Sequence, residues 1–228
     1  MPILRVLSYN VRSLRDDPVA VARVIRESGA HLVFLQEAPA FWRWRARCSQ
    51  LARRCAMVAV AGGGGGAFGN FLLCSPAVLA HSARTFRLAH APMRPDKGAA
   101  VAELSYGGVR FVAAGTHLTT GDATHGDERE AQLRSLLAEL SGPDGLPLIV
   151  AGDLNEEHTG PAWRALAARL TDAGAGSTTP TFSCRTPRRR IDGIFADPRL
   201  PVRQYRVLDS PDVRRASDHF PIYAELEL

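Results

Sequence analysis

The sequence of 228 residues contains a single lysine, Lys97, although its formal net charge is +5. Its positive charge therefore comes almost entirely from arginine, whose planar guanidinium group suits phosphate oxygens. A basic surface favours polyanionic partners such as nucleic acid or phosphorylated headgroups. A general bias in composition would produce the same excess of arginine, so charge alone does not establish a polyanionic partner.

Cysteine is also scarce, and no C-x-x-C pair occurs. This pattern argues against a zinc site built from cysteine pairs and against a disulfide framework. The four cysteines are Cys48, Cys55, Cys74 and Cys184. We expect all of them to be buried free thiols.

Long apolar runs are lacking as well. No stretch approaches the roughly 20 apolar residues that cross a bilayer, and residues 1–5 lack the charged start of a signal peptide. We therefore expect a cytoplasmic, monomeric protein without stable membrane insertion. The hydrophobic content of 46% is ample for a core and no Pro/Ser-rich linker interrupts the chain, so we predict one domain over residues 1–228.

Two segments, 3–37 and 110–155, repeat one plan. In each, an apolar strand pattern delivers a polar residue, a helix pattern follows, and a second strand pattern delivers another. Crossover units of this kind bring the carboxyl ends of their strands to the same edge of a sheet. The residues expected at this common edge are Asn10, Glu37, His117 and Asp153. The first helix is predicted over Pro18–Ser28, with proline in its first turn and Gly29 at its end.

Apolar residues recur at helical spacing in residues 39–54 and at the residue that follows, and they alternate with arginines. They are Phe41, Trp44, Cys48, Leu51 and Cys55. Aromatic rings among arginines also suit stacking on nucleic acid, but we favour a helix whose apolar face packs on the core. The five glycines at 62–66 lack the lysine and helix start of a P-loop, so we expect a flexible hairpin loop there.

The remaining segments are expected to alternate strands and loops. Near the end of the chain we predict a strand at 202–208, a loop through Asp212 and a closing strand at 222–228. Loops are also expected at 91–97 and 141–146, where proline or glycine interrupts the apolar patterns.

The polar residues at the strand ends indicate one chemistry. Carboxylate and amide oxygens are hard ligands that suit Mg²⁺, Mn²⁺ or Ca²⁺. Glu37 is the best single ligand candidate, because it ends a buried strand where a carboxylate without a cation is costly. Asp153 and Asn155 stand two residues apart, so an extended backbone turns both to one side, where they can orient a water or hold a phosphate oxygen. His117 and His219 can supply hydrogen bonds or protons to a phosphoryl group.

Six short motifs stand in one order within residues 8–221. They are Ser8-x-Asn10, Gln36-Glu37, Thr116-His117-Leu118, Gly152-Asp153-x-Asn155, Arg190-Ile191-Asp192 and Ser217-Asp218-His219. The set resembles the endonuclease/exonuclease/phosphatase superfamily, which includes deoxyribonuclease I-like nucleases. The resemblance implies an α/β (α+β) fold, a four-layered sandwich of two mainly antiparallel sheets packed face to face and flanked by helices. It also implies hydrolysis of phosphoesters that depends on a divalent metal, Mg²⁺ or Mn²⁺.

The resemblance further implies a role for each acidic or amide residue. Glu37 would bind the metal with help from Asn10 and Asp218. Asp153 would orient or deprotonate the attacking water, and Asn155 would hold the phosphate. Metal and imidazoles together would neutralise the charge that builds on the phosphoryl oxygens.

The resemblance also implies roles for the two histidines. The resemblance implies that His219, polarised by Asp192, acts at the phosphoryl group. His117 would stabilise the transition state or assist the leaving group. Which of the two serves as the acid and which as the stabiliser stays open.

Three further residues are expected to contact the substrate or support the site: Arg12, Asn70 and Arg190. Arg12 stands where AP endonucleases carry an acidic residue and where deoxyribonuclease I-like members carry arginine. This argues against an abasic-site enzyme and for a single main metal. Asn70 lies in a Gly-Asn-x-x-Leu pattern typical of the family and is expected to support the site, and Arg190 ends a basic run beside Asp192.

We predict a phosphodiesterase that acts on nucleic acid by in-line attack of water, because the net charge and the basic run at 188–190 suit a polyanion. One alternative is a phosphodiesterase or phosphatase that acts on a phospholipid headgroup or a small soluble phosphoester, although the sequence has no long apolar insertion to enter a membrane surface. A second alternative is a catalytically silent nucleic-acid-binding protein on the same fold. The intact acidic residues count against it.

Overall fold

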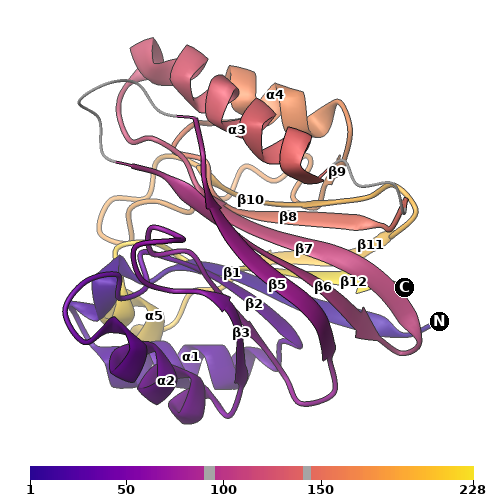
Figure 1. The fold of residues 1–228 in the computed structure, drawn as a ribbon. Coiled ribbons are helices and arrows are strands. Elements are labelled where there is room, and N and C mark those ends of the chain that lie inside the picture. Colours follow the sequence, from indigo (N-terminus) through magenta and orange to yellow (C-terminus); the bar gives the residue numbers. More distant parts are fainter. Residues whose placement is uncertain (90–95, 141–144) are drawn as a thin grey trace.

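The computed structural model describes residues 1–89, 96–140 and 145–228. Two six-stranded sheets lie face to face, with α1, α2 and α5 outside one sheet and α3 and α4 outside the other (Figure 1). This arrangement confirms the predicted four-layered α/β sandwich. Its elements are β1 Ile3–Asn10, α1 Pro18–Ser28, β2 Leu32–Gln36, α2 Trp44–Cys55, β3 Val58–Gly62, β4 Phe71–Cys74, β5 Leu79–Arg87, β6 Gly98–Tyr106, β7 Val109–His117, α3 Gly126–Leu140, β8 Leu148–Asp153, α4 Pro161–Ala167, β9 Thr171–Asp172, β10 Asp192–Ala196, β11 Val202–Val207, α5 Pro211–Ala216 and β12 Ile222–Glu227.

Each sheet is antiparallel except for one parallel pair at its centre. The strand orders are β11-β12-β1-β2-β4-β3 and β5-β6-β7-β8-β10-β9. The parallel pairs are β1 with β2, where Asn10 lies beside Gln36, and β7 with β8, where His117 lies beside Asp153. These are the two strand–helix–strand units predicted at 3–37 and 110–155. Their ends place polar residues from both sheets at one edge of the sandwich.

Three apolar clusters hold the layers together. The largest lies between the sheets and includes Phe34 of β2 and Phe111 of β7. A second joins α1, α2 and α5 to the first sheet, and a third packs Leu133 of α3 and Trp163 of α4 on the second sheet. Full burial of each large side chain stabilises the fold by about 1.5–3 kcal/mol. The site edge is therefore built on two sheets that a common core holds in place.

Helix α1 begins and ends where the sequence predicts. The Asp17 carboxylate accepts hydrogen bonds from the backbone N–H groups of Val19 and Ala20, and Pro18 occupies the first turn. Gly29 ends the helix in the left-handed conformation, with φ 62°, which glycine adopts without a side-chain clash. All four cysteines are buried free thiols, as expected.

Two local predictions are wrong. Helix α2 begins at Trp44, and Phe41 is 87% exposed instead of packed in the core. The segment before Trp44 is instead hydrogen-bonded to the glycine-rich loop, because the Ala38 N–H donates to the carbonyl of Gly69. The expected loop through Asp212 contains α5, whose first turn is capped by the hydroxyl of Ser210.

The loops predicted at 91–97 and 141–146 lie largely outside the described residues. Within the part of the chain that the structure describes, no helix is long and apolar enough to cross a membrane.

Candidate active site

Polar side chains from both sheets meet at the edge where the two parallel pairs end. They come from the ends of β1, β7 and β8, from the start of β10 and from the segments after β2 and before β12. The residues that the structure brings to this edge are Asn10, Glu37, His117, Asp153, Asp192 and His219. All six are predicted site residues, and the sheet register explains why they meet.

Asp153 lies at the centre of this group and is almost completely buried. Its Oδ2 atom accepts a hydrogen bond of 3.0 Å from Nδ2 of Asn10 and lies 3.5 Å from Nε2 of His117 and 3.7 Å from Nε2 of His219. Its Oδ1 atom accepts a 2.9 Å hydrogen bond from the backbone N–H of Asn155. One carboxylate therefore connects both sheets and both imidazoles.

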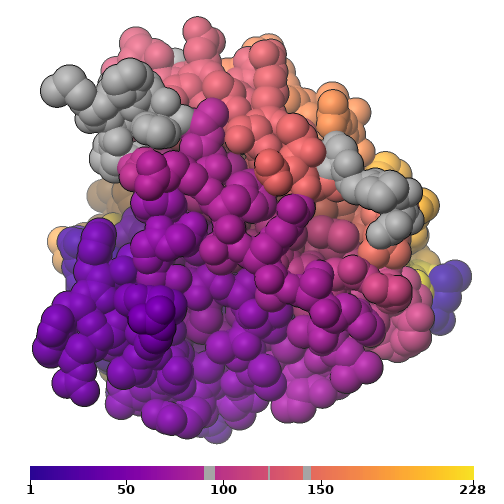
Figure 2. Space-filling model, in the orientation of Figure 1, coloured from indigo at the N-terminus to yellow at the C-terminus, as the bar shows by residue number. Residues whose placement is uncertain are grey.

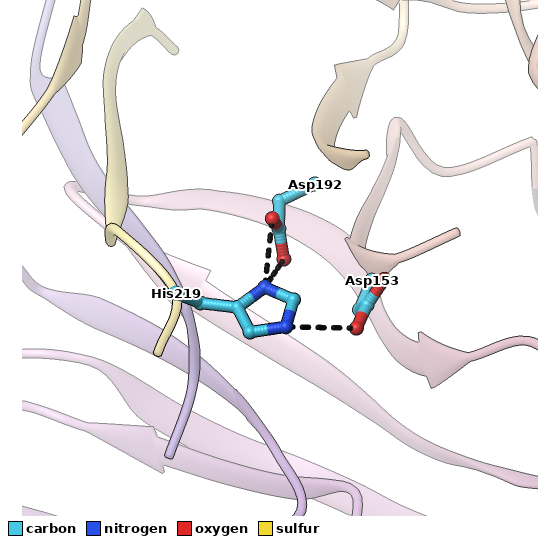
Figure 3. A group of neighbouring side chains, drawn as sticks. All are labelled: Asp153, Asp192 and His219. Atoms are coloured by element: carbon cyan, nitrogen blue, oxygen red, sulfur yellow. Dashed lines mark hydrogen bonds and ion pairs between the residues drawn. The ribbon is translucent and has the colours of Figure 1, made fainter. Parts of the chain in front are cut away.

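His219 lies between two carboxylates (Figure 3). Its Nδ1 atom is 3.1 and 3.2 Å from the two oxygens of Asp192, and its other nitrogen faces Asp153. Burial by itself disfavours the charged imidazolium, but the negative charges of Asp192 and Asp153 outweigh it and raise the pKa of His219 to about 10. His219 is therefore a cation at neutral pH.

His117, in contrast, is neutral. Burial lowers the pKa of His117 to about 3, and the positive charge of Lys97 acts in the same direction. Its Nε2 atom is buried and forms no hydrogen bond with the described residues, although Asp153 is 3.5 Å away. Without a metal, the site therefore holds one cationic and one neutral imidazole near the same Oδ2 atom of Asp153.

Glu37 stands at the open side of the group. Its Oε1 atom accepts a hydrogen bond of 3.1 Å from Nδ2 of Asn10, the same amide that donates to Asp153. Its backbone has a φ of 50°, which is rare for a residue with a side chain. The backbone of Gly69 passes so close to Glu37 that a Cβ atom added to Gly69 would lie 3.3 Å from the Cα of Glu37. A position that is held against this strain is typical of a functional residue.

The donor set fits a divalent metal. Asp153 and Asp192 each offer a carboxylate oxygen, and these atoms lie within 4.8 Å of one another and of a ring nitrogen of His219, which can bind a metal only in its neutral form. Asn10 and Glu37 add an amide and a carboxylate next to Asp153. Oxygen-rich sets of this kind suit Mg²⁺ or Mn²⁺ better than a metal that prefers thiolates.

Asp218 and Arg12 border the site together. The Nε atom of Arg12 lies 3.4 Å from Oδ2 of Asp218, and the backbone N–H of Arg12 donates to Oδ1 of Asn10 at 3.0 Å. Both side chains are partly exposed. Asp218 therefore faces a guanidinium group beside the cluster, while Glu37 faces the amide of Asn10.

Asn70 and Arg190 are not brought to the site. Asn70 is fully buried, and its amide donates to the carbonyls of Ala67 and Gly98, which braces the glycine-rich loop. Arg190 is buried as well, with NH2 2.6 Å from Oδ2 of Asp172. Its guanidinium also lies 4.6 Å from the ring centre of Trp163. Both residues support the fold around the site, and neither presents a free polar group to a substrate.

The sequence prediction missed Lys97 as a site residue. It lines the same hollow as Glu37 and His117. Burial lowers the pKa of Lys97, while the negative charges of Asp153 and Glu37 oppose this effect. Because β6 runs antiparallel to β7, the residue just before β6 reaches the edge where His117 ends β7. Its being the only lysine was the one available signal.

A buried ion pair was also missed. Nε of Arg129, on α3, donates to Oε2 of Glu156 at 3.0 Å, and both side chains are almost completely buried. The same guanidinium donates to the carbonyls of Thr119 and Asp122 in the loop that follows His117. Arg129 therefore connects the loop that follows His117 at the end of β7 to the loop after β8, which carries Asn155.

Solved structures with the same fold have low sequence identity to this chain. The human Nocturnin catalytic domain with bound sulfate has a TM-score of 0.80 at 20% identity, over 99% of this chain and 94% of that chain. TDP2 of D. rerio, complexed with a single-strand DNA product, has a TM-score of 0.81 at 19% identity over 100% of each chain. A mannosyl-6-phosphatase of Bacteroides thetaiotaomicron has a TM-score of 0.81 at 18% identity, over 99% of this chain and 100% of that chain.

A search of curated protein sequences finds no match to the chain. The sequence model of the Endonuclease/Exonuclease/phosphatase family, in contrast, matches residues 7–219. The match runs from within β1 to His219 and so includes all six motifs. The chain therefore belongs to the endonuclease/exonuclease/phosphatase family of phosphoester hydrolases.

Proposed function

We propose that the protein is a divalent-metal-dependent phosphodiesterase that hydrolyses nucleic acid by in-line attack of water. The observation that carries the proposal is the environment of Asp153. The amide of Asn10, the neutral imidazole of His117 and the cationic imidazole of His219 all lie beside its carboxylate. This arrangement places a base that can take a proton from water beside groups that can bind the oxygens of a phosphoester.

Each side chain has a distinct task in this reaction. Asp153 orients the water and takes its proton, and Asn155 holds a phosphate oxygen. His219, kept cationic by Asp192, donates from Nε2 to a phosphoryl oxygen as negative charge builds there. His117, which is neutral, acts on the side of the leaving oxygen.

Metal binding is assigned to Asn10 and Glu37, with Asp218 at the border of the site. The Asn10–Glu37 contact supports this assignment, because it places the Glu37 carboxylate beside the side-chain amide of Asn10. The Oδ1 atom of Asn10, which accepts from the backbone N–H of Arg12, would be its ligand atom. When bound, Mg²⁺ or Mn²⁺ supplies positive charge next to the phosphoryl oxygens.

Nucleic acid is the substrate class that the charge distribution supports best. A groove of about 450 Å³ next to the site is lined by four arginines, Arg12, Arg185, Arg214 and Arg215, together with Asp16 and Asp218. Arg12 is paired with Asp16 and Asp218, Arg214 with Asp209 and Arg215 with Asp212. Arg185 is exposed and forms no ion pair within the described residues. A row of guanidinium groups beside the reacting position suits the phosphates that flank a scissile bond. The names of the structural relatives cover a DNA product and a sugar phosphate, so the family alone does not choose between substrates.

The decisive test is hydrolysis with a panel of substrates. Plasmid DNA, single-stranded DNA and RNA are incubated with Mg²⁺ or Mn²⁺, and Asp153→Ala and His219→Ala serve as inactive controls. We expect cleavage by the natural protein and a loss of about 100-fold or more in each variant. Turnover of bis-p-nitrophenyl phosphate without any cleavage of nucleic acid would retain a hydrolase and reject a nuclease. Binding of DNA that needs no metal and leads to no turnover would instead support the silent binding protein.

The arginine groove has its own test. Substituting Arg185→Ala is expected to weaken binding of DNA regardless of its sequence and to reduce the salt dependence of the affinity by about one unit of slope. Arg110→Ala is the matched control, because Arg110 is an exposed arginine on β7 whose partner is Glu103 and it does not line the groove. Equal effects of Arg185→Ala and Arg110→Ala would show that the groove does not bind the nucleic acid.

A further inference from the structure

A hollow of about 710 Å³ opens beside the catalytic group, and residues of two kinds line it. The polar ones include Glu37, Asp96, Lys97 and His117. The apolar ones include Phe41 and Phe68, together with small residues of the loop after Glu37 and of the glycine-rich loop. The proposed phosphate position therefore continues directly into an aromatic-lined space.

Phe41 is unusual because its side chain is large, apolar and 87% exposed. The next residue, Trp42, is 78% exposed. Among the large hydrophobic residues that the structure describes, Phe41 and Trp42 are the two exposed aromatic ones. Exposure of neighbouring aromatic side chains costs hydrophobic stabilisation, so it indicates an interaction surface when it lies at a functional site.

The backbone beneath Phe41 is held in place. Its carbonyl accepts a hydrogen bond from the N–H of Trp44 at 2.9 Å, which ties it to the start of α2. The carbonyl of Pro39 accepts from Gly64 at 3.3 Å, and the ring of Trp44 packs against Gly64 so closely that an added Cβ would lie 2.4 Å from it. An exposed ring on a fixed backbone loses little freedom when a ligand covers it.

Phe68 forms the inner part of the same wall. It is partly buried, and its ring lies against Gly98 at the start of β6. The guanidinium of Arg87 lies 5.5 Å from the centre of the Phe68 ring. Arg87 is paired with Asp96 of the same hollow at 3.4 Å, so Lys97 is the cation nearest to the two rings that has no such pair among the described residues. The wall therefore combines two aromatic rings with a cation, which suits a ligand that is aromatic and negatively charged at once.

We propose that Phe41 and Phe68 form a base-binding subsite, which takes the nucleobase of the nucleotide attached to the scissile phosphate. This inference rests on the proposed function. Stacking on aromatic side chains tolerates every base, because each base has a π-face, so the subsite would favour single-stranded nucleic acid without selecting a sequence. A membrane surface is the less favoured occupant, since the exposed apolar surface here consists of two neighbouring side chains beside an open hollow instead of a broad apolar face.

The test compares two oligonucleotides with the same number of phosphates, one with bases and one made abasic throughout. Phe41→Ala is expected to lower kcat/KM for the base-bearing strand by roughly 5- to 100-fold, chiefly through KM, and to leave the abasic strand unchanged. Phe41→Tyr should retain most of the activity, because it keeps the ring. Leu79→Ala is the matched control, since Leu79 is an exposed apolar residue at the start of β5 outside the hollow.

Binding gives a readout that is independent of turnover. Fluorescence anisotropy of the labelled strands is measured with the Asp153→Ala protein, alone and combined with Phe41→Ala. Selective loss of affinity for the base-bearing strand supports the subsite. Equal loss for both strands, or no loss, overturns it even if the protein proves to be a nuclease. Turnover of phospholipid vesicles that depends on Phe41, with no cleavage of either strand, overturns both the subsite and the proposed function.

Discussion

The Nδ1 atom of His219 lies 3.1 Å from Oδ2 of Asp192, and both side chains are almost completely buried. This contact keeps the imidazole charged in an interior that would otherwise neutralise it. We expect His219 of the metal-free protein to titrate near pH 10 in an NMR experiment with labelled histidine. Asp192→Asn should lower that pKa, while His117 should remain neutral at pH 7 in both proteins. A His219 signal that titrates near its ordinary value of about 6.5 would contradict this charge assignment.

The same contact makes stability depend on pH. The pKa of His219 is raised in the folded state, so its stabilising contribution is fully present below the unfolded pKa of about 6.5 and is lost as the pH rises through about 10. Urea unfolding of the metal-free protein should therefore show a difference between the natural protein and His219→Gln that shrinks between pH 7 and pH 10. A difference that stays constant across this range would argue against the ion pair with Asp192.

Substitution of Glu37 should remove metal binding without unfolding the protein. Glu37 is partly exposed and contacts the amide of Asn10, so Glu37→Gln removes one negative ligand at little structural cost. We expect the affinity for Mn²⁺, measured by calorimetry, to fall at least tenfold, and the increase in Tm on adding Mn²⁺ to shrink accordingly. Glu27→Gln, an exposed acid at the end of α1, is the control and should change neither quantity. Unaltered Mn²⁺ affinity in Glu37→Gln would assign the metal to other residues.

The buried ion pair between Arg129 and Glu156 should matter for both stability and catalysis. Arg129→Met leaves the buried carboxylate without its cation, which is expected to cost about 3–5 kcal/mol in the free energy of unfolding. Arg134→Met is the control on the same helix, because Arg134 is exposed and its pair with Glu130 contributes less than about 1 kcal/mol. A positioning role for Arg129 further predicts that kcat falls more than KM rises at a temperature where the variant is fully folded. Similar changes in both variants would make the buried pair dispensable.

Lys97 is expected to bind a phosphate oxygen of the substrate. Its side chain lines the hollow beside Glu37 and His117 and forms no ion pair within 4.0 Å among the described residues. Lys97→Ala should therefore lower kcat/KM by about 10- to 100-fold, whereas Lys97→Arg should retain part of the activity because the charge remains. Since the chain has no other lysine, amine-selective labelling followed by mass spectrometry reports its exposure directly. Labelling that a bound oligonucleotide does not slow would place Lys97 away from the substrate.

Helix α1 and the two strand–helix–strand units followed from local patterns. Proline, an acidic cap and a terminal glycine bounded α1, and the two strand–helix–strand units appeared as the two parallel pairs. Such features depend on neighbours in the sequence or on the constant handedness of crossovers, so one chain is enough to predict them. The start of α2 was less predictable, because helical spacing of apolar residues does not show which of them the loop before the helix holds outside the core.

The sequence by itself determined that Asn10, Glu37, His117 and Asp153 would share one edge, because the ends of parallel crossover strands must lie together. Only the tertiary structure decided which way the remaining side chains turn. Long-range packing sets those contacts, and no periodicity along the chain records them. It buried Arg190 against Asp172 and Trp163, which removed an expected substrate contact, and it left Phe41 exposed. It also brought Lys97 to the site through the antiparallel pairing of β6 with β7.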